Sequence, residues 1–146
     1  MMDFVYDDGG RAAAGFKGTA GDCVCRAISI ATQLPYREVY DLINDFGKQE
    51  RGGKRRSGKS SARNGVYKDT IRKVMAHLGW TWTPTMKIGQ GCTVHLKSEE
   101  LPKGRIVVSL SGHSAAVVDG VLHDTYDSSR DGTRCVYGYY SKEETA

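Results

Sequence analysis

The sequence predicts an α+β fold in which N-terminal helices pack on one side of a C-terminal antiparallel sheet. Three segments of the first half repeat apolar residues at the i, i+3, i+4, i+7 spacing of amphipathic helices. After Gly79 the composition changes to Trp, Thr, Val, Ile and Tyr with turn residues at short intervals, which is typical of strands. The 146 residues suit one domain, residues 1–146, that buries a core without metal or disulfides.

The predicted helices are marked by the apolar stripes Val24–Ala31, Val39–Phe46 and Ile71–Leu78. Asp22 is a good N-cap residue for the first helix, which we expect to end near residues 33–34, and Pro35 fits the start of the second. The sequence before Asp22 holds few large apolar side chains, so we expect it to be irregular.

Glycines supply the expected helix ends, Gly47 for the second helix and Gly79 for the third. Beyond Gly79, the predicted strands are runs of β-branched and aromatic residues between turn residues. They are Trp80–Thr83, Thr93–Leu96, Arg105–Leu110, His113–Val118, Val121–Tyr126 and Arg134–Tyr140.

The composition excludes a membrane span, since no window approaches the roughly 18 apolar residues that a span requires. The polar start Met1-Met2-Asp3 does not resemble a secretion signal, so we expect a soluble, cytoplasmic protein. In a reducing compartment the four cysteines are expected to be free thiols, catalytic residues or metal ligands rather than a disulfide framework.

The net charge of +4 is concentrated in residues 48–64, which hold seven of the 21 basic residues and one of the 17 acidic ones. This Gly/Ser-rich segment has no hydrophobic periodicity, which predicts an exposed, flexible basic loop. Such a loop either is simply solvated or binds an anionic partner, a nucleic acid, a nucleotide or an acidic protein surface. The candidate anion-binding residues are Lys54, Arg55, Arg56, Lys59 and Arg63.

Residues 53–60 of this loop match the P-loop pattern GxxxxGKS. A P-loop needs a buried strand directly before it and a helix directly after it, because the helix N-terminus and the loop amides hold the phosphates. The flanking residues are polar or helix-breaking, so we do not expect an NTPase.

Cys23 is the first candidate for chemistry because it stands at the expected start of the first helix. The unsatisfied N–H groups and the macrodipole of a helix N-terminus favour a thiolate, the nucleophilic form of cysteine. A small buried cysteine is the alternative for Cys23, and it is the preferred interpretation of Cys25, which points to another side of the helix.

Asp119-Gly120 between two β-like runs predicts a two-residue hairpin turn that pairs Val118 with Val121. Opposed residues then sum to 239, which places Asp124 opposite residue 115 and on the same sheet face as His113. His123 and Asp127 fall on the other face. The pleat alone therefore selects one histidine and one aspartate as a base and its orienting carboxylate.

The words Asp22-Cys23-Val24-Cys25-Arg26-Ala27 and Gly112-His113-Ser114-Ala115-Ala116-Val117-Val118 resemble the papain-like cysteine peptidase superfamily. More closely, they resemble small phage and mobile-element proteins of that fold, with a DCxxRA helix start and a GHxxxxxDG…DT hairpin. The likeness covers about residues 21–34 and 105–128. It implies a papain-like fold with Cys23 as nucleophile, His113 as general base and Asp124 as orienter.

The chain departs from this family at the oxyanion hole, where a glutamine usually precedes the nucleophile. The glutamines are Gln33, Gln49 and Gln90, so the backbone N–H of Cys23 needs another donor, such as Thr19 or Lys17. One oxyanion donor is worth roughly 3 kcal/mol, and its loss bears directly on catalytic efficiency.

These observations predict a thiol hydrolase of peptidase or isopeptidase type that acts on a host or phage protein without a cofactor. A deamidase, a transglutaminase and an amidase use the same groups, and the sequence does not separate them. The rival prediction is an inactive papain-like binding protein that sequesters a host protein, nucleotide or nucleic acid through its cleft and basic loop. A zinc site is not expected, because the cysteines and histidines show no metal-ligand spacing.

Overall fold

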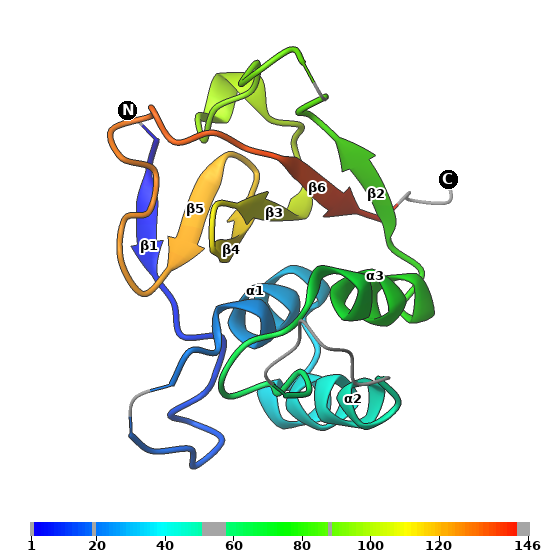
Figure 1. The fold of residues 1–146 in the computed structure, drawn as a ribbon. Coiled ribbons are helices and arrows are strands. Elements are labelled where there is room, and N and C mark those ends of the chain that lie inside the picture. The colour runs from blue at the N-terminus through cyan, green and yellow to red at the C-terminus, as the bar shows by residue number, and fades with distance from the viewer. Residues whose placement is uncertain (1, 19, 51–57, 88, 143–146) are drawn as a thin grey trace.

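The computed structural model describes residues 2–18, 20–50, 58–87 and 89–142, and over these residues the chain is α+β, as predicted (Figure 1). Its helices are α1 (Cys23–Thr32), α2 (Tyr36–Lys48), α3 (Lys68–His77) and the 3-10 turn η1 (Ser98–Glu100). Its strands are β1 (Phe4–Tyr6), β2 (Thr81–Pro84), β3 (Arg105–Leu110), β4 (His113–Val118), β5 (Val121–Asp124) and β6 (Gly138–Ser141).

The three predicted helices are present, with Asp22 and Pro35 at the N-cap positions of α1 and α2. Gly79, at φ +83°, follows α3, and the N–H of residue 80 bonds the Met75 carbonyl oxygen at 2.8 Å, as in a glycine-terminated helix. The predicted stop at Gly47 is wrong, because α2 continues to Lys48. Gly47 instead permits close packing, since a Cβ there would lie 2.4 Å from the carbonyl oxygen of residue 60.

The strands form one sheet in the order β1-β5-β4-β3-β6-β2. The predicted antiparallel sheet is wrong at one edge, because β1 pairs with β5 in parallel, and the predicted irregular N-terminus is therefore wrong for Phe4–Tyr6. The predicted strand Thr93–Leu96 is also wrong: its described backbone makes only an isolated bridge, between His95 and Cys135. The predicted strands at 121–126 and 134–140 are shortened to β5 and β6.

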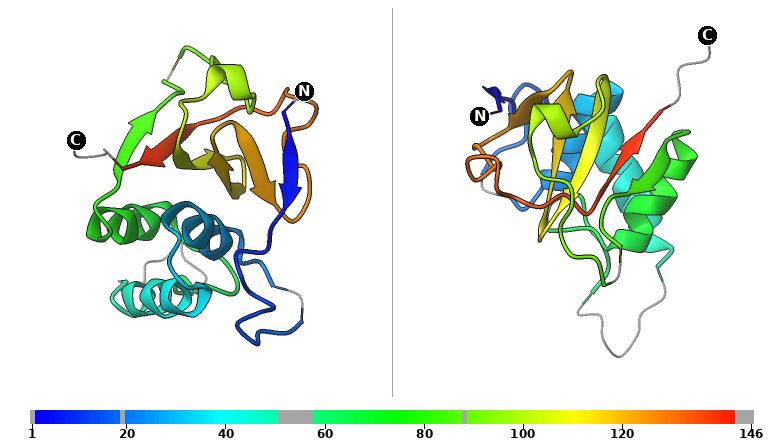
Figure 2. Two further views of the ribbon diagram at one scale, coloured as in Figure 1. Left: turned by 180° about the vertical axis from the view of Figure 1, so that it is seen from behind. Right: turned by 90° about the horizontal axis from the view of Figure 1, so that it is seen from above.

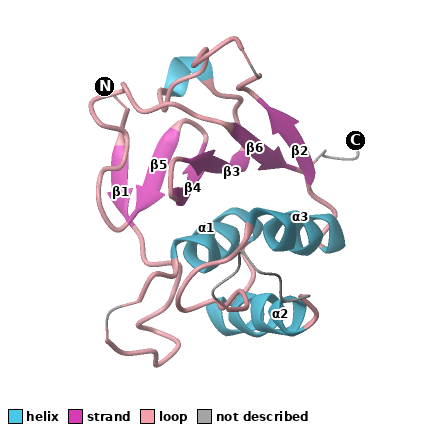
Figure 3. Ribbon diagram, in the orientation of Figure 1, coloured by secondary structure: helices cyan, strands magenta, loops and turns pink. Residues whose placement is uncertain are grey.

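All three α-helices lie on one face of the sheet (Figures 1 and 3). Helices α1 and α3 lie next to the strands, and α2 packs on α1 and α3 on the side away from the sheet. The view from behind in Figure 2 shows the same arrangement. Buried Ile28, Ile43 and Met75 fill the core between helices and sheet. Segments after β2 and before β6 cover the opposite face, where Leu96 and Val136 are fully buried.

Arg105 at the start of β3 fixes the orientation of α1. Its Nη2 donates to the carbonyl oxygen of Ile30 at 2.6 Å, and its Nε donates to that of Ala31 at 3.1 Å. These carbonyls belong to the last turn of α1, where a cation is favoured by the helix dipole. The opposite end of α1, which begins at Cys23, therefore lies over β4 and β5.

The expectation that the cysteines are free thiols, catalytic residues or metal ligands is wrong for two of them, since Cys92 and Cys135 form a disulfide with a Cα–Cα distance of 5.9 Å. The backbone bridge between His95 and Cys135 brings the two chain segments together. Pairing of distant segments depends on tertiary structure, which cysteine spacing alone does not reveal. Within the described residues no helix is long and apolar enough to cross a membrane.

Candidate active site

Cys23 is the first residue of α1 and lies at an open cleft. The first intrahelical bond is donated by the Arg26 N–H to the carbonyl oxygen of Asp22 at 3.0 Å, so the N–H of Cys23 precedes the helical ladder and has no acceptor within it. Gly21 lets the neighbouring loop approach this end of the helix, because a Cβ there would lie 3.3 Å from the carbonyl oxygen of Asn64. Helix geometry thus places a thiol and a backbone donor side by side.

The β4–β5 hairpin places His113 and Asp124 as the pleat predicts. Its paired residues sum to 239, and the turn residues Asp119 and Gly120 both have positive φ, at 49° and 80°. Nε2 of His113 lies 2.7 Å from Oδ2 of Asp124, and their side chains are only 9% and 2% exposed. The carboxylate therefore orients a nearly buried imidazole.

The side chain of His113 also lies close enough to the Cys23 thiol for hydrogen bonding and charge to shift the pKa of both groups. Because Nε2 faces Asp124, the ring nitrogen that remains for the sulfur is Nδ1. The structure thus brings together three predicted residues from one helix and two strands: Cys23, His113 and Asp124.

The electrostatics of this group favour a charge-separated thiol and imidazole. Burial raises the pKa of Cys23, but hydrogen bonds from His113 and the Ser114 backbone, with the charges of His113 and Arg26, outweigh it and hold the pKa below its ordinary value. Burial lowers the pKa of His113, but its bonds to Asp124 and Cys23 outweigh this and raise it to about 9. The Cys23 thiolate and the His113 imidazolium therefore stabilise each other.

Asp124 supports this charge separation as a carboxylate. Burial raises its pKa, but hydrogen bonds from His113, the Thr125 N–H and the Ser128 hydroxyl hold the pKa below its usual value. Ser128 Oγ donates to Oδ2 at 2.9 Å, and the Thr125 N–H donates to Oδ1 at 2.7 Å. The orienting group is thus itself fixed by bonds to both oxygens.

Cys23 and His113 line a cleft of about 570 Å³, a size typical of ligand sites. Residues 64–66 and α3 form one wall of the cleft, and the β3–β4 segment forms another. Tyr126, 51% exposed, leans over the imidazole with its ring centroid 5.4 Å from that of His113. The thiol is therefore reachable from solvent while the imidazole is partly shielded.

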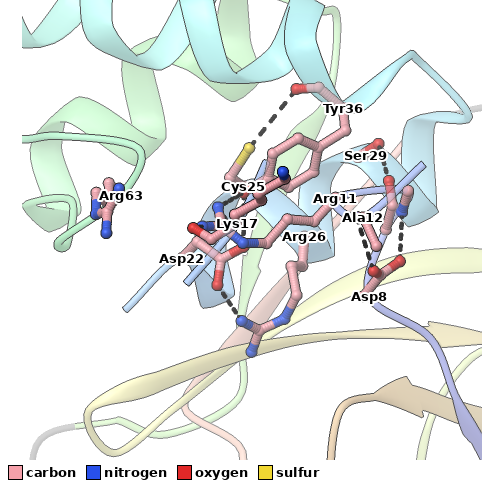
Figure 4. A network of polar contacts seen from close by, with 12 residues as sticks. Asp8, Arg11, Ala12, Lys17, Asp22, Cys25, Arg26, Ser29, Tyr36 and Arg63 are labelled. Carbon is pink, nitrogen blue, oxygen red and sulfur yellow. Dashed lines mark hydrogen bonds and ion pairs between the residues drawn. The ribbon is translucent and has the colours of Figure 1, made fainter. Parts of the chain in front are cut away.

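Asp22, immediately before Cys23, does not cap α1 with its side chain. The carboxylate is 2% exposed and instead accepts hydrogen bonds from Arg26 and from the Tyr36 hydroxyl, the latter at 2.6 Å (Figure 4). Arg11 lies 3.8 Å from the same carboxylate. The sequence predicts Asp22 only as a helix cap, and this buried network is not apparent from it.

Cys25 is buried among the same residues, as expected for a filling thiol. Its sulfur lies 3.8 Å from the carbonyl oxygen of Tyr36. Burial is the main cause that raises its pKa to about 12. The two neighbouring thiols, Cys23 and Cys25, therefore have opposite electrostatic environments.

The predicted oxyanion donors are not brought to the thiol by the described residues. Lys17 is exposed and does not line the Cys23 cleft, and Thr19 lies outside the described residues. Gln33 is the C-cap of α1, at the far end of the helix from Cys23. Beside the sulfur the described residues supply two backbone donors, the Cys23 N–H at the start of α1 and the Ser114 N–H.

The candidate anion-binding residues Lys54, Arg55 and Arg56 also lie outside the described residues. Lys59 is exposed and donates to the Lys48 carbonyl oxygen at 2.9 Å. Arg63 is also exposed. It directly precedes residues 64–66, which line the Cys23 cleft, but it does not line the cleft itself. The P-loop pattern follows helix α2 rather than a strand, and the next helix begins only at residue 68.

The described residues contain no group of three or more His, Cys, Asp or Glu side chains placed to hold a metal ion. Two of the four cysteines, Cys92 and Cys135, are joined to each other by a disulfide. His95 instead contacts Glu100 at 3.2 Å, and His123 contacts Asp7 at 3.0 Å.

Sequence reasoning missed three side chains around the triad: Arg26, Tyr126 and Ser128. Arg26 stands within the DCxxRA word, and its position one turn after Asp22 was the available signal. The other two lie after β5, where the chain has no regular periodicity. A scan of family models finds no match for this chain, and searches of curated proteins and of solved structures find none either.

Proposed function

We propose that this chain is a thiol hydrolase of the papain-like kind that transfers acyl groups through Cys23, with His113 as acid and base and Asp124 as its orienter. The observation that carries this proposal is the contact of thiol, imidazole and carboxylate at the start of a helix, in an open cleft. A nucleophile, its base and the base's orienter within hydrogen-bond reach are the parts that acyl transfer requires.

The reaction begins with attack of the Cys23 thiolate on the carbonyl carbon of the substrate. The negative charge that develops on the carbonyl oxygen is stabilised by the Cys23 N–H. The His113 imidazolium gives its proton to the leaving amine as the bond to carbon breaks, which leaves a thioester. Imidazole then takes a proton from water, the hydroxide displaces the thiolate, and the acid product leaves with the site restored.

The proposed substrate is a polypeptide. A second pocket of about 420 Å³, lined partly by Tyr6 and Phe16, lies next to the Cys23 cleft and shares Arg26 and Thr125 with it. An extended chain therefore has room beyond the reacting carbonyl. The resemblance to small phage and mobile-element proteins favours a host or phage protein as this substrate.

The first test is alkylation of Cys23 by iodoacetamide between pH 5 and pH 9, followed by mass spectrometry under non-reducing conditions. The wild-type rate should stay high below pH 8, where an ordinary thiol is protonated, and His113→Ala should abolish this advantage. His123→Ala is the matched control, because His123 pairs with Asp7 rather than with the thiol. Buried Cys25 serves as the internal reference.

Cleavage of a peptide amide library tests the acyl-transfer half of the proposal. Activity should disappear in Cys23→Ala while the fold is retained, as judged by circular dichroism. An ordinary alkylation profile that His113→Ala leaves unchanged would overturn the proposal.

One observation favours a second candidate, a catalytically inactive binding protein: no glutamine lines the cleft within the described residues. For this candidate, a host protein captured by the wild type is also captured by Cys23→Ala, and Cys23 alkylation shows an ordinary pH dependence. The same two measurements therefore separate the candidates.

A further inference from the structure

Arg26 lies one helical turn after Asp22, between two buried carboxylates. Its Nη1 donates to Oδ1 of Asp22, and its Nη2 lies 3.6 Å from Oδ1 of Asp124. The Arg26 side chain is 12% exposed, and each carboxylate is 2% exposed. A single guanidinium thus joins the start of α1 to the end of β5.

The two oxygens of Asp124 have different partners. Oδ2 faces His113 at 2.7 Å and accepts the Ser128 hydroxyl, whereas Oδ1 accepts the Thr125 N–H and faces Arg26. The imidazole and the guanidinium therefore approach the carboxylate through different oxygens. Its orientation toward His113 depends on contacts on both sides.

The charged groups alternate in sign along a buried path. The order is Arg11, Asp22, Arg26, Asp124, His113 and Cys23, with the thiol as its anionic end. These groups come from the N-terminal segment, α1, β4 and β5, and the Tyr36 hydroxyl of α2 also bonds Asp22 (Figure 4). Each charge therefore has neighbours of opposite sign.

We propose that Arg26, held by Asp22, is a positioning residue of the thiol site: it holds Asp124 from the side opposite His113 and thereby sets the charge state of the Cys23–His113 pair. This inference rests on the proposed function. A carboxylate as buried as Asp124 stays ionised only with cationic and hydrogen-bonding partners. The Arg26 charge also acts directly on Cys23 in favour of the thiolate.

The planar fork of arginine explains why this residue type suits the position. Two separate nitrogens face two carboxylates on different elements, which a lysine ammonium on a flexible stem does not reproduce with the same geometry. Loss of the guanidinium leaves both Asp22 and Asp124 without this cation. Both changes disfavour a further negative charge on Cys23.

The test is the pH profile of Cys23 alkylation in Arg26→Met, Arg26→Lys and the double variant Asp22→Asn/Arg26→Met. The acid limb of the profile is the pH range in which the alkylation rate falls because the Cys23 thiolate becomes protonated. In Arg26→Met this limb should move up by about 1 pH unit, which makes alkylation about tenfold slower at a pH below the limb. Arg26→Lys should return the limb toward its wild-type position because it restores the charge. The double variant removes one buried negative charge and one buried positive charge, so the net charge of the site is unchanged. Asp124 still lacks its cation in this variant, so the acid limb should remain raised.

Arg105→Met is the matched control, because Arg105 bonds the other end of the same helix. It should lower the melting temperature without moving the limb. If Arg26→Met does not fold, the double variant gives the decisive profile. A wild-type limb in folded Arg26→Met or in the double variant, while His113→Ala abolishes activation, would overturn the positioning role and leave the proposed function standing. No activation of Cys23 in the wild type would refute both.

Discussion

Replacing Asp124 by Asn should remove most of the driving force that keeps His113 protonated. The pKa of His113 lies at about 9, compared with 6.5 for an ordinary histidine. That difference corresponds to about 3 kcal/mol in favour of the imidazolium. Burial lowers this pKa and Asp124 is the main cause that raises it, so loss of the Asp124 charge should bring the pKa back toward 6.5, with only the Cys23 interaction left to oppose burial.

The His113 pKa is measurable from imidazole ¹⁵N shifts in a long-range NMR correlation between pH 5 and pH 10. The wild-type imidazole should be mostly protonated at pH 7.5, and the Asp124→Asn imidazole mostly neutral. Asp7→Asn is the matched control, since Asp7 pairs with His123 at 3.0 Å on the neighbouring strand. It should leave the His113 titration unchanged.

Asp124→Asn should also change how the free energy of unfolding depends on pH. A raised folded-state pKa stabilises the fold fully below the unfolded value of about 6.5, and this contribution is lost as the pH rises through about 9. The destabilisation caused by Asp124→Asn should therefore be larger at pH 6 than at pH 10, by up to about 3 kcal/mol in urea unfolding. A His113 pKa that stays near 9 in Asp124→Asn would refute this reasoning, because the carboxylate would not be its cause.

Three further outcomes are expected. Hydrolysis should decline above pH 9, where His113 loses the proton needed by the leaving group, whereas iodoacetamide alkylation should not; parallel declines would contradict the assignment. Reduction of the Cys92–Cys135 disulfide should lower the free energy of unfolding by about 4 kcal/mol, which is the loop-closure entropy expected for a separation of 43 residues. Urea unfolding with and without a phosphine reductant measures this change, and an unchanged midpoint would contradict it. Gly138→Ala should cost about 1–3 kcal/mol, because its Cβ would lie 2.3 Å from the Trp82 ring, and an unchanged melting temperature would show that the ring moves freely.

The pairing of His113 with Asp124 could be predicted from the sequence because it depends on local geometry. Asp119-Gly120 determines the turn, the turn determines the register, and the pleat then assigns each side chain to a face. The same holds for the position of Cys23 at the start of α1, which the apolar stripe predicts even though the Asp22 side chain does not cap the helix.

The elements that escaped prediction depend on contacts between distant segments. Strand β1 has three residues, too few to show alternation, and it exists because β5 offers a parallel edge. The disulfide forms because an isolated backbone bridge brings the segments of Cys92 and Cys135 together, and no local sequence pattern predicts that bridge. Arg26 acquires its role only when β5 brings Asp124 to the helix.

The parallel pairing of β1 with β5 also has a consequence for biosynthesis. Strand β1 and helix α1 are synthesised before the strands that carry His113 and Asp124. Until then β1 has no partner strand, and Cys23 lacks the imidazole that favours its thiolate. A nascent chain that has not yet reached β4 therefore holds Cys23 without the imidazole and the carboxylate that surround it in the folded protein.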